Sequence, residues 1–298
     1  MEQKENTEIQ KKIIYDRIYK PLLIVPAILL IFSIFYLVNF NAKNGDIIYK
    51  DVSLTGGTIL TVFDNKADVK EIKNSLKEKF LDINVREISD IRTGKQHGFF
   101  VETKAEADEI KKAVEEILGY ELKNENSSIE FTGSSLSASF YQQLRLAIVI
   151  AFILMAIVVF IVFRSFAPSL AVILAAFADI VMTIVVVDMI GINISAAGII
   201  AFLMLIGYSV DTDVLLTTRV LRNHEGTINE RIFGAFKTGM TMTLTSIAAA
   251  GVAFFIVYGL SDTLRQIFGI ILIGLGFDIF NTWITNASIL KWYAENKK

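Results

Sequence analysis

The sequence contains no cysteine and only two histidines among its 298 residues. Without cysteine the chain can form no disulfide bond, no thiolate nucleophile and no cysteine-ligated metal or iron–sulfur centre. His97 and His224 are too few to build a histidine-rich metal site on their own. We therefore expect neither a metal site nor another cofactor.

An excess of basic charge is also missing, since 29 Lys and Arg stand against 31 Asp and Glu and the formal net charge is -2. This balance argues against nucleic-acid binding. Apolar residues, in contrast, make up 53% of the chain, and the mean hydropathy is +0.51. Several apolar runs reach the roughly 20 residues that a helix needs to cross a bilayer. The composition therefore indicates an integral membrane protein.

The first apolar run, Pro21–Phe40, follows a polar tail at residues 1–20. A cleaved signal peptide is the alternative, but the run has full spanning length and no A-x-A pattern follows it, which favours a retained anchor. We expect a five-helix bundle at residues 142–290 and a short tail at 291–298. Its five apolar runs are Leu146–Phe163, Ser169–Ile190, Ser195–Leu216, Thr238–Gly259 and Leu264–Leu290.

Residues 41–141, between the first and second spans, carry charges throughout and predict a soluble domain. Period-2 and period-3.6 patterns alternate in the order strand, helix, strand, strand, helix, strand, which is typical of an α+β ferredoxin-like domain. The expected strands are residues 51–63, 83–91, 98–103 and 127–133, and the expected helices are 67–80 and 105–119.

The positions of Lys and Arg near the helix ends predict the orientation of the chain. Most of them fall on one side of the six spans, in the tails and in two connections, where they include Arg164, Arg219, Arg222, Arg231 and Lys237. The opposite connections hold only Arg265. Because cytoplasmic connections are enriched in Lys and Arg, we expect both termini in the cytoplasm and the soluble domain outside the cell membrane.

Two carboxylates lie inside the fourth apolar run, in the segment GYSVDTDVLLTTR at residues 207–219. A charged side chain at membrane depth costs at least about 2.5 kcal/mol, so acids there predict a functional role such as proton transfer. Asp211 and Asp213 are separated by about 200° around a helix, so the two cannot share one helix interface. Asp213 shares a stripe with Ser209 and Thr217, which also favours a structural hydrogen-bonding face.

Other polar residues in the spans have both a functional and a structural interpretation. Asp179 in the third span and Asp278 in the sixth are further candidates for a proton relay. For Arg219, the positive-inside rule favours a role as an anchor at the membrane interface over a role in the relay. Asp188 lies near the outer end of its span, where we expect water to reach it.

Several stretches resemble SecF members of the SecD/SecF branch of the resistance-nodulation-division superfamily, which has the same order of one domain and five further spans. The resemblance covers nearly the whole chain, and Ala178 stands where the family pattern has histidine. The matching stretches are SLTGGTIL with Thr55, Gly56 and Gly57, FTGSSLSASF at 131–140, ADIVMT at 178–183, GYSVDTDVLLTTR, and NHEGTINERIFGAFKTGMTMTLTS at 223–246. For the two glycines we expect a bend or a close backbone approach rather than substrate binding.

The resemblance implies a non-enzymatic protein-export subunit that pairs with SecD and docks on the SecY translocon. It also implies that proton motive force moves the outer domain and helps a translocating polypeptide across the bilayer, with sodium as the alternative coupling ion. SecD-type fourth spans place their acid at the position of Asp211. Asp211 is therefore the favoured carrier, with Asp179 as its companion.

Two other functions fit parts of the sequence. One is a half-size transporter of lipids or small molecules from the same superfamily, which would need a partner because the chain contains only one repeat unit. The other is an intramembrane aspartyl protease, but GLGFD at residues 274–278 has one residue too many for the G-x-G-D motif and no Y-D pair accompanies it.

Overall fold

The computed structural model describes residues 16–80, 83–89, 93, 95–223, 225–258 and 261–296. Most of the predicted N-terminal tail and the last two lysines lie outside these residues, as does part of the predicted turn before residue 98. Within the described residues, six helices are long and apolar enough to cross a membrane. The predicted number of spans is thus confirmed.

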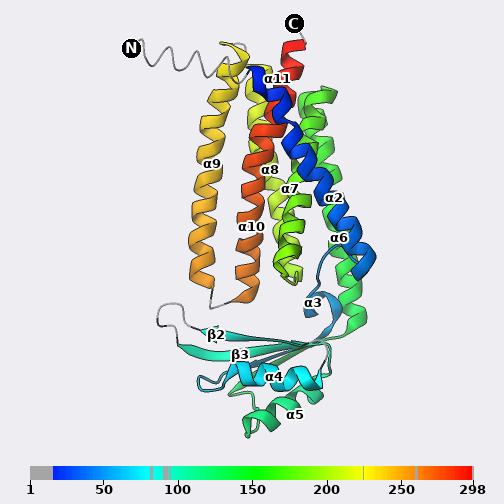
Figure 1. Cartoon of the computed structure of the whole chain (residues 1–298), viewed down its shortest axis with the longest axis vertical. Helices are drawn as coiled ribbons and strands as arrows, with labels where there is room; N and C mark the ends of the chain where they lie inside the picture. Colours follow the sequence, from blue (N-terminus) through cyan, green and yellow to red (C-terminus); the bar gives the residue numbers. More distant parts are fainter. Residues whose placement is uncertain are drawn as a thin grey trace.

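The membrane-spanning helices form a bundle with the soluble domain at one end (Figure 1). We call this end the domain end; the C-terminal helix and the α8–α9 connection lie at the opposite, far end. The sixth span consists of α10, the π-helix η1 and α11, which follow one another without a break. The helices are α2 (Ile24–Asn44), α6 (Ser134–Phe163), α7 (Phe166–Ile190), α8 (Ala196–Arg222), α9 (Ile228–Val257), α10 (Asp262–Phe280), η1 (Asn281–Asn286) and α11 (Ala287–Asn296).

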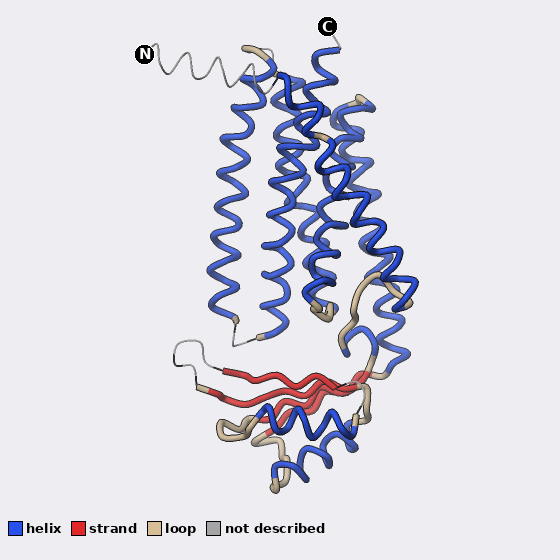
Figure 2. Tube along the Cα trace, viewed as in Figure 1, coloured by secondary structure: helices blue, strands red, loops and turns tan. Residues whose placement is uncertain are grey.

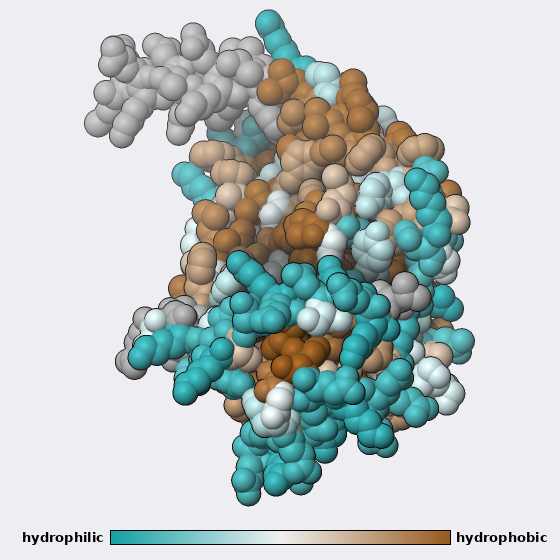
Figure 3. All heavy atoms as spheres, turned by 60° about the horizontal axis from the view of Figure 1, so that its bottom comes forward, coloured by the Kyte–Doolittle hydropathy of each residue, from teal (hydrophilic) through white to brown (hydrophobic). Residues whose placement is uncertain are grey.

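The centre of the bundle is formed by α7, α8 and α10, and α10 contacts α7, α8 and α9. Their buried apolar side chains include Val187, Phe202 and Leu275. In contrast, α2, α6 and α9 expose many large apolar side chains. The visible flank of the bundle is accordingly brown and the domain mostly teal in Figure 3. This distribution fits a bundle surrounded by lipid and a domain surrounded by water.

The soluble domain has a four-stranded antiparallel sheet in the order β2-β3-β1-β4, with two helices on the face away from the bundle (Figures 1 and 2). Side chains such as Leu60, Phe99 and Ile110 pack between the sheet and these helices. The topology is compatible with the predicted ferredoxin-like arrangement. The elements are β1 (Gly57–Val62), α4 (Val69–Lys79), β2 (Ile83–Ser89), β3 (Gln96–Thr103), α5 (Ala107–Leu118) and β4 (Ser127–Thr132).

The prediction of one strand across residues 51–63 is wrong in its first half, because Val52–Thr55 form a short helix, α3. The Asp51 carboxylate starts this helix by accepting a hydrogen bond from the Ser53 backbone N–H at 2.8 Å. Gly56 then ends it with φ of 83°. The strand begins only at Gly57.

Gly56 and Gly57 both lie where another backbone comes too close for a side chain. A Cβ atom on Gly56 would be 2.4 Å from the Cα atom of Ser134, the first residue of α6. One on Gly57 would be 2.3 Å from the Thr103 carbonyl oxygen on β3. Both residues also have positive φ, which other L residues adopt only at a cost. The pair therefore joins the sheet tightly to the start of the second span.

A second set of contacts joins the domain to α8 and α10. The Ser53 hydroxyl accepts a hydrogen bond from the Ala196 backbone N–H at 3.0 Å. Gln266 on α10 accepts from the Ser195 backbone N–H at 2.9 Å and donates to the Asn193 carbonyl oxygen at 2.5 Å. The α7–α8 turn and the start of α8 are thus hydrogen-bonded both to Ser53, at the start of the domain, and to Gln266 in the sixth span.

We expect Gly56→Ala to destabilise the protein more than Gly119→Ala. Both positions have positive φ, so each substitution costs about 1 to 2 kcal/mol in backbone strain. Only Gly56 also has a backbone atom within 2.4 Å of the new Cβ, whereas nothing lies within 4 Å at Gly119. Thermal unfolding in detergent measures the difference, and equal shifts for the two variants would show that the contact with α6 contributes nothing.

Candidate functional site

Three carboxylates from three different helices meet in the centre of the bundle. Asp179 on α7 and Asp213 on α8 are 0% exposed, and Asp278 on α10 is 1% exposed. None of them forms an ion pair with any residue that the structure describes. Their partners are hydroxyl and amide groups, so the site is a buried acidic cluster without a counter-ion.

Asp179 is held by two donors from neighbouring helices. The Ser209 hydroxyl on α8 donates to its Oδ2 atom at 2.6 Å. The Asn281 side-chain amide on η1 donates to its Oδ1 atom at 2.7 Å. Both oxygens of this carboxylate are therefore satisfied across helix interfaces.

Asp278 is surrounded by hydroxyl groups. Thr212 on α8 donates to it at 2.9 Å, and Thr282, one turn further along the same span, lies at 3.3 Å. Thr243 on α9 contributes a longer contact of 3.5 Å. The Ser209 hydroxyl, which donates to Asp179, also lies near this carboxylate. Asp278 thus lies between the other parts of the cluster.

Asp213 completes the cluster on the side towards the far end of the bundle. Its Oδ1 atom accepts hydrogen bonds from Thr282 at 2.9 Å and from the Asn286 amide at 2.8 Å. Its Oδ2 atom is buried and has no hydrogen-bond partner among the described residues. Buried polar atoms are rarely left unpaired, and this oxygen can still accept a hydrogen bond.

Hydroxyl groups connect the three carboxylates into one row. Ser209 lies between Asp179 and Asp278, and Thr282 lies between Asp278 and Asp213. A hydroxyl carries a single proton and can donate to only one carboxylate at a time. The row can therefore change its hydrogen-bond pattern without any change in the positions of the helices.

The π-helix η1 supplies several of these partners. Asn281 points to Asp179 on α7, whereas Thr282 and Asn286 point to Asp213 on α8. A π-turn widens the helix locally, and such turns are frequent at functional sites. The sequence places Asn281 three positions after Asp278 on the same helix, but its amide donates to Asp179 instead. Asn286, eight positions after Asp278, was not foreseen as a partner of these acids.

The structure separates Asp211 from Asp213, as the 200° rotation predicts. Asp213 is buried in the cluster, whereas Asp211 is exposed on the outer face of α8. The acid that family resemblance favours as the principal carrier is therefore not brought together with Asp179. Asp213, for which the sequence also favours a structural hydrogen-bonding face, lies in the cluster with Asp179 instead.

Asp188 and Arg219, two further polar residues of the spans, lie apart from the acidic cluster. Asp188 is only 3% exposed, so the expectation that water reaches it is wrong. The segment that follows α2 covers this end of α7, with Asp46 and Tyr49 near the carboxylate. Arg219 donates a hydrogen bond to the Gly234 carbonyl oxygen of α9 at 2.7 Å. This bond connects α8 to α9, and the Arg219 side chain lies outside the acidic cluster.

The family is identified by sequence. A family profile described as "Protein export membrane protein SecD/SecF, C-terminal" matches residues 110–296. A protein named "Protein-export membrane protein SecF" from Methanothermobacter thermautotrophicus is 39% identical over 95% of this chain and 96% of its own length. A protein of the same name from Methanolacinia petrolearia is 37% identical over 93% of this chain and 94% of its own. This chain belongs to the SecF family.

The fold is shared with a solved SecDF structure. A crystal structure described as SecDF, a translocon-associated membrane protein, from Thermus thermophilus aligns with 93% of this chain at a TM-score of 0.72 and 18% identity. A structure of SecDF in a super-membrane-facing form aligns at a TM-score of 0.58. The chain spans 38% of the length of the first of these, so a SecF-family chain of this size corresponds to a part of that protein.

We expect Asn281→Ala to lower the free energy of unfolding by about 1 to 3 kcal/mol, because it removes one of two donors to a buried carboxylate. Asn39→Ala is the matched control, since the Asn39 amide donates to a backbone carbonyl on an exposed helix face. Its effect should stay within about 0.5 kcal/mol. Denaturation in mild detergent compares the two, and equal effects would contradict the assignment of Asn281 as a partner of Asp179.

Proposed function

We propose that this chain is a SecF subunit that promotes protein export through the Sec pathway, with the buried acidic cluster as its proton carrier. The family membership supports the export role, since relatives that match almost the full length of the chain are named protein-export membrane proteins. The observation that supports the carrier is the row of three buried carboxylates, which have no counter-ion among the described residues.

The chemistry of the cluster fits proton transfer. An isolated buried carboxylate pays a large desolvation cost when ionised, and the presence of two further acids adds repulsion. Taking up or losing one proton therefore changes the energy of the packing between α7, α8 and η1. The hydroxyls of Ser209 and Thr282 provide a path between neighbouring carboxylates.

The contacts at the domain end couple this change to the domain. Ser209 and Asp213 lie in the middle of helix α8, where their side chains belong to the acidic cluster. The first residue of the same helix, Ala196, forms a hydrogen bond with Ser53 at the start of the domain. A shift of α8 between two packings would therefore move the anchorage of the domain. We infer that proton binding and domain movement are linked in this way.

The partner proposed for this chain is a SecD subunit, and the translocon proposed for the pair is SecY. The solved SecDF structure contains a chain much longer than this one, which supports a second, SecD-like half. Asp211, exposed on α8 together with Met204 and Tyr208, lies on a face that such a half would cover. In this arrangement Asp211 would contact the partner rather than carry protons within this chain.

The absence of cysteine makes the proposed orientation directly testable. We expect a cysteine introduced by Glu125→Cys, on the surface of the domain, to react with a membrane-impermeant maleimide in intact cells. The matched variant Glu225→Cys, exposed in the α8–α9 connection, should react only after the cells are opened. The reverse pattern would place the termini outside and the domain inside.

We expect Asp213→Asn to reduce proton-coupled export at least tenfold while Asp211→Asn stays within about twofold of the wild type. The reason is that only Asp213 belongs to the buried row, and a loss of about 1.4 kcal/mol already changes a rate tenfold. Export of a secretory precursor into vesicles that contain the protein and its SecD partner, with and without a pH gradient, measures the effect.

Both variants must assemble with SecD, which co-purification checks. Loss of coupling in Asp211→Asn with normal coupling in Asp213→Asn would transfer the carrier role to Asp211. Normal coupling in Asp213→Asn, Asp179→Asn and Asp278→Asn would remove the acidic cluster from the mechanism.

A further inference from the structure

Three buried polar atoms around Asp213 lack a hydrogen-bond partner. They are the Oδ2 atom of Asp213 itself, the side-chain oxygen of Asn286 and the hydroxyl oxygen of Thr217. Each of the three residues is 0% exposed, and none of the three atoms is paired with any residue that the structure describes. Since buried polar atoms in native proteins are rarely unpaired, we expect these three to bond to one another in one of their protonation states.

The three groups lie close together on two facing helices. Asn286 on η1 is in direct contact with Asp213 on α8, because its amide N–H donates to the other carboxylate oxygen, Oδ1, at 2.8 Å. Thr217 follows Asp213 by four positions on α8, so the two side chains share one face, with Cβ atoms about 5 to 6 Å apart. The Asp213 carboxyl therefore has both the amide and the hydroxyl as neighbours.

This group of atoms is one donor short when Asp213 is ionised. An ionised carboxylate and an amide oxygen can only accept hydrogen bonds, so Asp213 and Asn286 then present two unpaired acceptors. The Thr217 hydroxyl carries a single proton and can donate to only one of them. One buried acceptor then stays unpaired, which is unfavourable.

A proton on the Oδ2 atom of Asp213 supplies the missing donor. The resulting O–H group can donate to the Asn286 oxygen, while the Asn286 N–H continues to donate to Oδ1. The acid and the amide are then joined by two hydrogen bonds, and the Thr217 hydroxyl can donate to Oδ2. Every atom of the group has a partner in this arrangement.

The neighbouring acids favour the same position for the proton. Asp179 accepts a hydrogen bond at each oxygen, from Ser209 and from Asn281, so an ionised carboxylate is satisfied there. The titratable groups that act on Asp213 are Asp278 on α10 and Asp179 on α7, and η1 carries no titratable residue. Because both neighbours are acids, a negative charge on either one opposes a further charge on Asp213.

The basic residues of α8 and α9 that lie nearest in sequence to the cluster bond elsewhere. Arg219 on α8 donates to a backbone carbonyl of α9, and Arg231 on α9 donates to a backbone carbonyl of α8. Lys237 on α9 is exposed and lies over the ring of Phe233. None of these three positive charges is therefore bonded to the Asp213 carboxyl.

On the basis of the proposed carrier role of this cluster, we propose that Asn286 holds the carried proton on Asp213, because its oxygen accepts a hydrogen bond from the protonated Oδ2 atom. Asn286 is thus a positioning residue, and the packing of α8 against η1 described above is the proton-loaded state. When the proton leaves to water, the O–H bond breaks and its electron pair stays on Oδ2. The Asn286 oxygen then loses its donor, which weakens the contact between α8 and η1.

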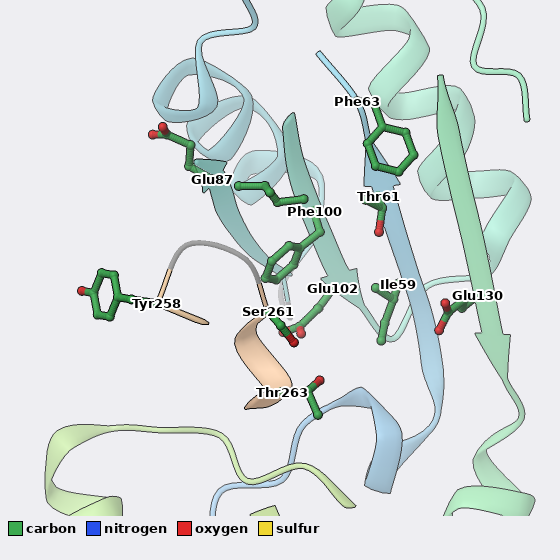
Figure 4. Close-up of a pocket in the computed structure, with 11 residues that line it drawn as sticks. Ile59, Thr61, Phe63, Glu87, Phe100, Glu102, Glu130, Tyr258, Ser261 and Thr263 are labelled. Carbon is green, nitrogen blue, oxygen red and sulfur yellow. The ribbon is translucent and has the colours of Figure 1, made fainter. Parts of the chain in front are cut away.

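The start of the same sixth span faces the soluble domain. Ser261 and Thr263 line a pocket of about 390 Å³, and Phe100 and Glu130 of the sheet lie on its other side (Figure 4). Because α10 and η1 follow one another without a break, a change in the contact at η1 can move this wall of the pocket relative to the sheet. The proton on Asp213 is thereby linked to the domain through α10 as well as through α8.

Infrared difference spectroscopy of the full chain in lipid nanodiscs at neutral pH tests the proposal, because a protonated carboxyl has a C=O band that an ionised one lacks. The wild type should show such a band, and Asp213→Asn should lose it. Asn286→Leu should keep the band but move it to higher frequency, since the carboxyl loses both hydrogen bonds to the amide. The swapped variant Asp213→Asn/Asn286→Asp, which exchanges the acid and the amide, should restore a band near the wild-type frequency.

Two controls accompany these variants. Ser137→Ala removes a buried hydroxyl that also lacks a partner among the described residues but lies in the first turn of α6, at the domain end. Its band should equal that of the wild type. Asp179→Asn should also keep the band, because Asp179 is satisfied in its ionised form. If Asn286→Leu fails to fold, the swapped variant decides the role of Asn286.

The absence of an Asp213-dependent band in the wild type would overturn the proposal. So would an equal frequency in the wild type and in Asn286→Leu, or loss of the same band in Asp179→Asn. These outcomes are separate from a failure of the proposed function. If the band is absent but Asp213→Asn still abolishes proton-coupled export, Asp213 remains the carrier and only its pairing with Asn286 is wrong.

Discussion

A carboxylate buried among membrane-spanning helices depends on hydrogen-bond donors from other helices, because neither lipid nor apolar side chains can supply them. Three such groups determine how the centre of this bundle packs. Asp179 on α7 accepts hydrogen bonds from Ser209 of α8 and Asn281 of η1. Asp213 on α8 accepts hydrogen bonds from Thr282 and Asn286 of η1. The π-turn in the sixth span carries three of these partners, Asn281, Thr282 and Asn286.

The same helices carry the soluble domain at their other end. The start of α8 bonds to the domain entry through Ser53, and Gln266 of α10 bonds to the α7–α8 turn. Because Gly56 has no side chain, the backbone between α3 and β1 can lie directly against the start of α6. The proposed proton site and the domain are therefore connected by continuous helices and short polar contacts.

Much of the fold could be predicted because its signals are local. A spanning helix needs about 20 apolar residues, and each of the six shows such a run. The strands and helices of the domain follow from periods of 2 and 3.6. Helix α3 was missed because four residues are too few to show a helical period, and its formation depends on the Asp51 cap and on the turn at Gly56. The second span begins at Ser134, earlier than its apolar run, because its first turns are polar and lie beside the domain.

The sequence by itself determined the number of spans, the order of elements in the domain, the family and the presence of acids at membrane depth. Only the tertiary structure decided which of those acids meet. Lipid and the bundle interior are both apolar, so hydropathy does not mark which face of a spanning helix turns inward. The rotation of α8 that buries Asp213 and exposes Asp211 depends on partners such as Asn286, which lies 73 residues away in the chain. Contacts over that separation arise only when the helices pack.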